Sequence, residues 1–249
     1  MFYLNTNPVI KNMENTGYCK TLDENFSLAC ELISRTQSHA ELINMLKNGN
    51  IVEKQLAALK LDTVNSKEEA QILLNNLTGQ DGKVREAVSA KIAELAAAQD
   101  KLILFNPVKN YQKFLESIID INGNICRNII STLENLTCDK EFCSVFVPEL
   151  IKKSLELALK VQNFDLQEGK YKINKEVFKL YWYLETIYVF AASVNTADLK
   201  NLLNSTKSIN EYTIREKTAK ILSKNFNDKD LDNIRQLLKN DTNYYVRRF

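Results

Sequence analysis

A short phrase recurs along this chain and constrains its fold more than any other sequence feature. It consists of a polar turn, then Val or Ile, then Arg and a helical run, and its clearest copy is "QDGKVREAVSAKIAEL" at residues 80–95. Val52 to Val84 and Ile214 to Val246 each span 32 positions. Self-similarity at this period predicts stacked structural units. The apolar markers of the successive copies are Val52, Val84, Cys126, Val177, Ile214 and Val246.

A second helical segment precedes each copy of the phrase, so each unit is predicted to be helix, turn, helix. Ser66, Thr196 and Asn227 are expected to cap the starts of three of these segments, because their side chains can accept hydrogen bonds from free backbone N–H groups. Pro107 and Pro148 are expected in first helical turns. The predicted first helices cover residues 38–49, 66–77, 106–119, 147–161, 196–205 and 227–240, and residues 24–36 form one helix upstream.

Composition supports a chain that is nearly all helix. Only 6 Gly and 3 Pro occur in 249 residues, which leaves few of the tight turns that sheet folds require. Hydrophobic residues make up 45% of the chain, enough for a continuous core. The sequence therefore predicts an all-α fold in which each two-helix unit covers the apolar stripe of the next.

These repeats resemble the HEAT-repeat family, which is armadillo-like, over residues 37–249. The family's Asp-x-x-Val-Arg signature is matched by Asp81, Val84 and Arg85, whereas Glu53 and Lys179 depart from the expected arginine. A proline in the first helix, as at Pro148, is also typical of the family. Looser matches pair Asn122 with Arg127, Ile214 with Arg215, and Asp241 with Val246 and Arg247.

The resemblance implies a right-handed α-solenoid, a superhelix of about five to six HEAT-like repeats in one domain over residues 1–249. Residues 1–23 are expected to form an irregular N-terminal cap and residues 24–249 the repeats, with the last repeat incomplete. The second helices are expected to line the concave face. The signature Asp or Asn should cap the second helix, and the Arg should pair with that acid or with its counterpart in the adjacent unit.

The sequence offers no support for catalysis or for a bound cofactor. Glycine-rich phosphate loops and serine-nucleophile motifs are absent, and the one histidine, His39, rules out zinc motifs that need two. His39 is interpreted as a solvated or capping residue at a helix start. We therefore expect no catalytic, cofactor-binding or metal-binding residues.

The five cysteines lack the spacing of a disulfide framework or a zinc site. Each is expected to be a small buried apolar residue, which fits a reducing cytoplasm. The chain has no run of about 18 apolar residues and no leader-like start, so no membrane segment is predicted.

One helix carries the strongest signal for partner binding, "VFKLYWYLETIYVF" at residues 177–190. On a helical wheel, the apolar stripe lies opposite a face that holds Lys175, Lys179, Trp182 and Thr186. Tryptophan flanked by lysine suits a protein hot spot. For Trp182 the preferred interpretation is nevertheless packing inside the solenoid, because a solenoid helix contacts its partner and both neighbouring units.

We predict a non-catalytic protein-binding or scaffolding function that uses the concave surface and an unknown protein partner. The alternative is a nucleic-acid-binding or DNA-repair HEAT-like protein, and a bilin-lyase-like enzyme is a more distant one. The balance of 33 basic and 31 acidic residues favours the protein partner over nucleic acid. A lysine patch would serve the nucleic-acid alternative, or would simply solvate exposed helices. Its members are Lys152, Lys153, Lys160, Lys170, Lys172, Lys175 and Lys179.

Overall fold

The chain is an all-α repeat solenoid. A computed structural model describes residues 18–162, 170–224, 226 and 228–249, and all regular elements in these residues are helices. Six helix-turn-helix pairs follow one another, within the predicted range of five to six. The chain divides into two compact units, Met1–Lys91 and Ile92–Phe249, and the division falls within the helix α6 (Gly82–Ala96).

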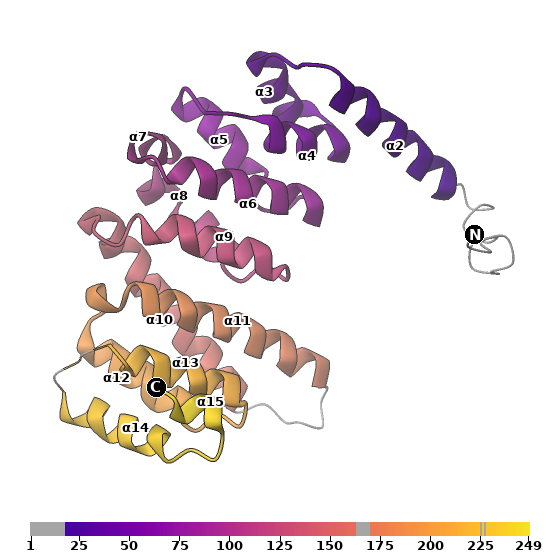
Figure 1. Ribbon diagram of the computed structural model, residues 1–249. Coiled ribbons are helices and arrows are strands. Elements are labelled where there is room, and N and C mark those ends of the chain that lie inside the picture. Colours follow the sequence, from indigo (N-terminus) through magenta and orange to yellow (C-terminus); the bar gives the residue numbers. More distant parts are fainter. Residues whose placement is uncertain (1–17, 163–169, 225, 227) are drawn as a thin grey trace, which may run out of the picture. The chain divides into compact units, whose positions relative to one another are not determined.

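Unit 1 consists of α2, the pair α3/α4, α5 and the start of α6 (Figure 1). Helix α3 packs against both α4 and α5, and α4 also packs against α2. The side chains of Leu46, Ala57 and Leu73 are fully buried where these helices meet. The bounds are α2 Tyr18–Ser34, α3 His39–Asn48, α4 Ile51–Lys60 and α5 Lys67–Asn75.

Unit 2 is built as two adjacent layers of helices. The first helices α8, α10, α12 and α14 pack one on the next, and so do the second helices α9, α11, α13 and α15 (Figure 1). This layering brings residues of α11, α13 and α15 onto one face, although they are far apart in the sequence. The bounds are α8 Pro107–Ser117, α9 Gly123–Glu134, α10 Lys140–Gln162, α11 Lys170–Val189, α12 Thr196–Thr206, α13 Tyr212–Leu222, α14 Lys229–Lys239 and α15 Tyr244–Arg247.

The predicted helix starts agree with the structure at some positions and not at others. Ser66 caps α5 by accepting from the amide of Glu69, and Pro107 occupies the first turn of α8, as predicted. The cap of α12 is Asn195 instead of Thr196, because the side-chain oxygen of Asn195 reaches the amide of Ala197 two residues on and accepts from it. Asp228 caps α14, and the predicted cap Asn227 lies outside the described residues.

Two insertions explain why the repeat spacing is uneven. The short helices α7 (Gln99–Leu102) and η2 (Ile103–Phe105) stand between the second and third pairs. The fourth pair has the two longest helices, α10 with 23 residues and α11 with 20. Pro148 lies inside α10 and not in a first turn, so the prediction that this helix starts near residue 147 is wrong. Proline cannot donate a backbone hydrogen bond, but α10 packs on both neighbouring first helices, α8 and α12, and this packing outweighs the lost bond.

Aromatic packing fixes α10 against the end of α11 in unit 2. The rings of Phe142 and Phe146 stack with centroids 4.9 Å apart, and Phe190 lies 5.3 Å from Phe146. All three side chains are buried. This cluster holds the C-terminal half of α11 in place and so positions the side chains that α11 presents on its other face.

The N-terminal cap and the cysteines differ from expectation. Helix α2 begins at Tyr18, inside the segment expected to be irregular, and residues 1–17 lie outside the described residues.

Cys126 is buried as expected, but Cys30 and Cys138 are exposed, because they fall on the outward sides of their helix and loop. No described helix is long and apolar enough to cross a membrane.

Candidate binding surface

Lysine and tyrosine side chains interleave between α11 and α13. The ammonium of Lys217 lies 4.4 Å from the ring centre of Tyr181. Lys220 and Lys224 both lie over the ring of Tyr188, at 4.4 and 4.2 Å. These contacts arise because each helix presents residues three or four positions apart on one side, and the two helices are neighbours. We call this surface the lysine–tyrosine face, made of Tyr181, Glu185, Tyr188, Lys217, Lys220 and Lys224.

Glu185 is the one carboxylate of the lysine–tyrosine face. Lys220 contacts its Oε1, and the ammonium of Lys217 approaches Oε2 at 2.7 Å as an ion pair without hydrogen-bond alignment. Burial raises the pKa of Glu185, but the ion pairs with Lys217 and Lys220 outweigh it and leave the pKa below the ordinary value. Three ammonium groups against one carboxylate give this face an excess of positive charge.

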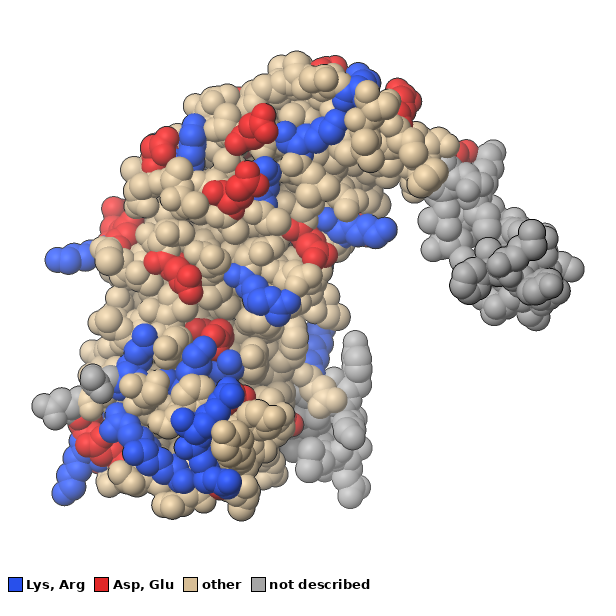
Figure 2. All heavy atoms as spheres, viewed as in Figure 1, with Lys and Arg blue, Asp and Glu red and all other residues tan. Residues whose placement is uncertain are grey.

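Helix α15 extends the basic character of the same face. Arg248 lies 5.5 Å from the ring centre of Tyr245 and reaches Glu216 of α13 at 2.6 Å. Figure 2 shows Lys and Arg side chains gathered over the region where Figure 1 labels α13 and α15. Tyr245 is 51% exposed, so aromatic and cationic groups are both accessible there. The arrangement suits an anionic, partly apolar ligand.

The structure separates the four residues predicted to bind a partner. Trp182 is 7% exposed, which agrees with the interpretation that it packs inside the solenoid. Thr186 is fully buried, so neither residue shares an open face with Lys175 and Lys179. Lys175 is exposed, and Lys179 is half-buried with its ammonium 3.3 Å from Glu176. Helix α11 packs on α9, α10 and α13, which covers the side that holds Trp182 and Thr186 and leaves Tyr181 and Tyr188 partly exposed. Partner binding by these four residues stays a prediction.

Trp182 packs within the layer of second helices. Its ring meets Phe178 and Tyr181 edge-on, with centroids 6.1 and 5.2 Å away. Gly123, in the first turn of α9, lies beside the indole, and a Cβ there would be in ordinary van der Waals contact with it at 3.4 Å. The indole N–H has no hydrogen-bond partner among the described residues. The aromatic surface of the tryptophan, and not its polar edge, accounts for its position.

The signature arginines hold the turns between helices. Arg215 donates to the carbonyls of Ile209 and Asn210 at 2.7 and 2.8 Å. Arg247 donates to those of Asp241 and Thr242 at 2.6 and 2.8 Å, and Arg85 reaches the carbonyl of Gln80. In all three copies an acceptor lies five residues before the arginine, so one side chain closes the turn that precedes its own helix.

Arg215 shows the expected pairing with an adjacent unit. Arg215 binds both carboxylate oxygens of Asp241, at 2.6 and 3.1 Å. Arg127 differs, because it contacts Asn124 on its own helix and lies 6.0 Å from the ring centre of Trp182.

The acidic and apolar signature positions have local roles. Asp81 accepts from the amide of Lys83 at 2.9 Å, which caps the start of α6, and Val84 is fully buried. Asn122 caps α9 in the same way. Asp241 differs, because it accepts from the amide of Asn243, and Asn243 is the residue that caps α15.

The predicted lysine patch is offset by carboxylates. Lys152 lies 3.9 Å from Glu149, and Lys160 lies 3.6 Å from Glu176. Lys153 shares its surroundings with Glu156. Lys170 and Lys172 lie outside the described side chains. This alternation makes a weak phosphate track.

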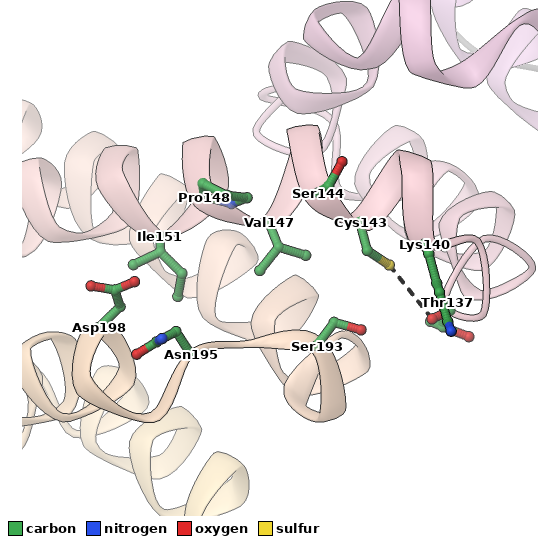
Figure 3. A pocket seen from close by; sticks show the side chains of 10 residues that line it. All are labelled: Thr137, Lys140, Cys143, Ser144, Val147, Pro148, Ile151, Ser193, Asn195 and Asp198. Carbon is green, nitrogen blue, oxygen red and sulfur yellow. Dashed lines mark hydrogen bonds between the residues drawn. The ribbon is translucent and has the colours of Figure 1, made fainter.

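Other features give no support for a reaction centre. His39 lies at the start of α3, where its Nε2 is 3.0 Å from Glu69 and 3.1 Å from Asn65. A cavity of about 350 Å³ lies between α10 and α12 (Figure 3). There the thiol of Cys143 points to the carbonyl of Thr137 at 3.5 Å. The described residues contain no cluster of His, Cys, Asp and Glu that could hold a metal ion.

Sequence reasoning missed the residues that make the lysine–tyrosine face. A helical wheel places Tyr181 and Tyr188 on the apolar stripe of α11, and no motif marks Lys217, Lys220 and Lys224 as binding residues. A signal was present: the three lysines recur at positions three and four apart on the predicted helix. Their pairing with the tyrosines depends on α11 and α13 being neighbours, and the sequence of neither helix shows that they are.

Comparison with known proteins supports the fold. No family model matches the chain, and no curated protein sequence matches it. A solved structure of computationally designed armadillo repeat proteins for modular peptide recognition matches with a TM-score of 0.50 at 12% identity, covering 85% of this chain and 96% of that chain. A designed armadillo repeat protein matches over the same shares at 12% identity with a TM-score of 0.49. The chain therefore has an armadillo-like repeat fold.

Proposed function

We propose that this protein binds an acidic segment of a protein partner along the lysine–tyrosine face, without catalysing a reaction. The observation that carries the proposal is the placement of Lys220 and Lys224 over one tyrosine ring, beside a single carboxylate already neutralised by Lys217 and Lys220. A cation held over a ring keeps its charge available to a second anion. The armadillo repeat structure described as made for peptide recognition has a similar fold, which agrees with this use.

A protein partner fits the face better than nucleic acid does. The accessible cations are few, because Lys217 is 8% exposed and Arg248 is engaged by Glu216. A duplex carries about one charge per 1.7 Å and needs a longer basic track. The lysines of α10 and α11 do not supply that track, since glutamates accompany them. A binding role in a reducing compartment such as the cytoplasm agrees with the free thiols of the described cysteines.

The test measures binding of fluorescent ten-residue peptides to the full chain. An acidic peptide of glutamate and glycine is compared with its lysine counterpart and with a single-stranded oligonucleotide. We expect the acidic peptide to bind, and the double substitution Lys220→Gln/Lys224→Gln to weaken it about fivefold or more, since two exposed charge contacts contribute about 1 kcal/mol together. Glutamine is used because glutamate would repel Glu185.

The matched control is Lys152→Gln/Lys153→Gln on α10, which removes the same charge from the other layer of helices. This control should leave the affinity unchanged. Equal weakening by both double variants would show a general charge effect and reject the proposed surface. Tighter binding of the oligonucleotide, with a steep salt dependence, would favour the nucleic-acid alternative.

A further inference from the structure

An apolar cavity lies near the N-terminal end of α11, whereas the lysine–tyrosine face lies toward its C-terminal end. It has a volume of about 230 Å³ and lies between the turn after α8 and the start of α11. Ile119, Ile121 and Phe178 form its walls, with Lys175 and Lys179 beside them. Ile121 is 75% exposed, the highest value among the exposed large apolar side chains of the described residues. An engineered cavity of about 150 Å³ accommodates benzene, so this cavity has room for a large apolar side chain.

The cavity has a firm base and a charged rim. Phe178 meets the ring of Trp182 edge-on at 6.1 Å, and Trp182 is itself fixed by the helices around it. None of the described residues that line the cavity is acidic, whereas two are lysines. The ammonium of Lys179 is paired with Glu176 at 3.3 Å, and Lys175 is exposed. Lysine stems extend an apolar wall while their ammonium groups remain at the mouth. The charge at the rim is therefore complementary to carboxylates next to an apolar residue.

The cavity and the lysine–tyrosine face lie on one stripe of α11. Phe178, Tyr181, Glu185 and Tyr188 follow at helical spacings of three, four and three, and all four side chains are partly exposed. From Phe178 to Tyr188 the helix rises about 15 Å at 1.5 Å per residue. An extended peptide covers that distance in about five residues.

We propose that this stripe binds one extended acidic peptide, with a large apolar side chain in the cavity and a carboxylate cluster about five residues away at Lys220 and Lys224. This inference rests on the proposed function and adds to it an apolar anchor and a spacing. The cavity supplies selectivity for the anchor, because only a large side chain removes Ile121 and Phe178 from water. The lysines supply attraction for the acidic end.

The experiment uses the full chain with isotope-labelled isoleucine methyl groups and two synthetic peptides. One peptide carries phenylalanine, a four-residue glycine–serine spacer and three glutamates, and the other has serine in place of phenylalanine. We expect the phenylalanine peptide to bind about fivefold more tightly and to shift the methyl signals of Ile119 and Ile121. Both chain directions of each peptide are measured, since the stripe does not fix the polarity.

Two matched substitutions test the anchor. Ile121→Ser should reduce binding of the phenylalanine peptide to the level of the serine peptide, whereas Ile103→Ser, at an isoleucine 66% exposed elsewhere, should have no effect. Equal binding of the two peptides with unshifted Ile121 signals would overturn the anchor, and Lys220→Gln/Lys224→Gln would then still report on the proposed function. Binding of neither peptide would overturn both.

Discussion

The contact between Arg215 and Asp241 shows how one side chain joins consecutive repeats. Asp241 receives two hydrogen bonds from Arg215 and a third from the amide of Asn243 at 2.8 Å. The hydrogen bonds from Arg215, which outweigh burial, hold the pKa of Asp241 below its ordinary value, and the Asn243 amide adds to this. The same carboxylate thus links α13 to the turn before α15.

This lowered pKa makes the stabilising effect of Asp241 dependent on pH. Because the folded-state pKa is below the unfolded value of about 3.9, the stabilisation is present above pH 4 and is lost as pH falls through the folded-state pKa. Asp241→Asn should lower the free energy of unfolding by about 1–3 kcal/mol at pH 7, with a smaller loss near pH 3. Denaturant titrations at both pH values measure this, and Asp100→Asn, at an exposed aspartate, is the control. The same loss at both values would contradict a charge effect.

The thiols of Cys126 and Cys138 are expected to differ in reactivity because only Cys126 is buried. Burial, with a smaller effect of Asp120, raises the pKa of Cys126 to about 12. The thiolate is the reactive form, so alkylation of Cys126 at pH 8 should be at least about a hundredfold slower than that of exposed Cys138. Timed alkylation followed by peptide mass spectrometry gives both rates. Similar rates would mean that α9 is not packed as described.

Two glycines show how the turns control the helices of unit 1. Gly49 lies between α3 and α4, where an added Cβ would meet the carbonyl of Met45 at 2.5 Å and the Cβ of Glu53 at 2.8 Å. Gly82 begins α6, and nothing lies within 4 Å of a Cβ there. Substitution by alanine is therefore expected to have opposite effects on stability at the two positions.

Gly49→Ala should destabilise the protein by about 1–3 kcal/mol, because the backbone of α3 or α4 must shift. Gly82→Ala should stabilise it by about 0.4–1 kcal/mol through reduced freedom of the unfolded chain. Midpoints of urea unfolding for the two variants and the parent check both signs. If the unfolding midpoint of Gly49→Ala equals that of the parent, the backbones at this turn are not as close as described.

Stability should vary along unit 2, because each helix pair contacts only its neighbours. In solenoids the stability of a repeat depends on its own packing and on the adjacent interfaces. Helix α14 packs on α12, α13 and α15, and Ile234 on this helix is 3% exposed. Local unfolding caused by a change at Ile234 is therefore expected to involve the helices next to α14 first.

Ile234→Ala should lower the free energy of local unfolding by about 2–4 kcal/mol and remove hydrogen-exchange protection from α14 and α15. Protection in α8 and α9 should remain, because α14 packs on α12, α13 and α15. The control is Leu237→Ala on the same helix, at a side chain 53% exposed. Uniform loss of protection over α8 to α15 would show that unit 2 unfolds as one cooperative body.

Much of the fold could be predicted from the sequence because its signals are local. Helical periodicity, the caps at Ser66 and Asn122 and the repeated phrase involve residues within one or two turns of one another. These signals determine where the helices lie and that they form stacked pairs. The signature arginines also act over short distances, since Arg215 and Arg247 each reach carbonyls five residues back.

Only the tertiary structure decided which surfaces are covered and which remain open. A helical wheel places Trp182 and Thr186 away from the apolar stripe of α11, yet packing of three other helices on α11 buries them. The lysine–tyrosine face and the cavity beside Ile121 arise from helices that are distant in sequence. The sequence by itself determined the repeated helical unit, because periodicity records which side of each helix needs a partner, whereas the partner is set by how the units stack.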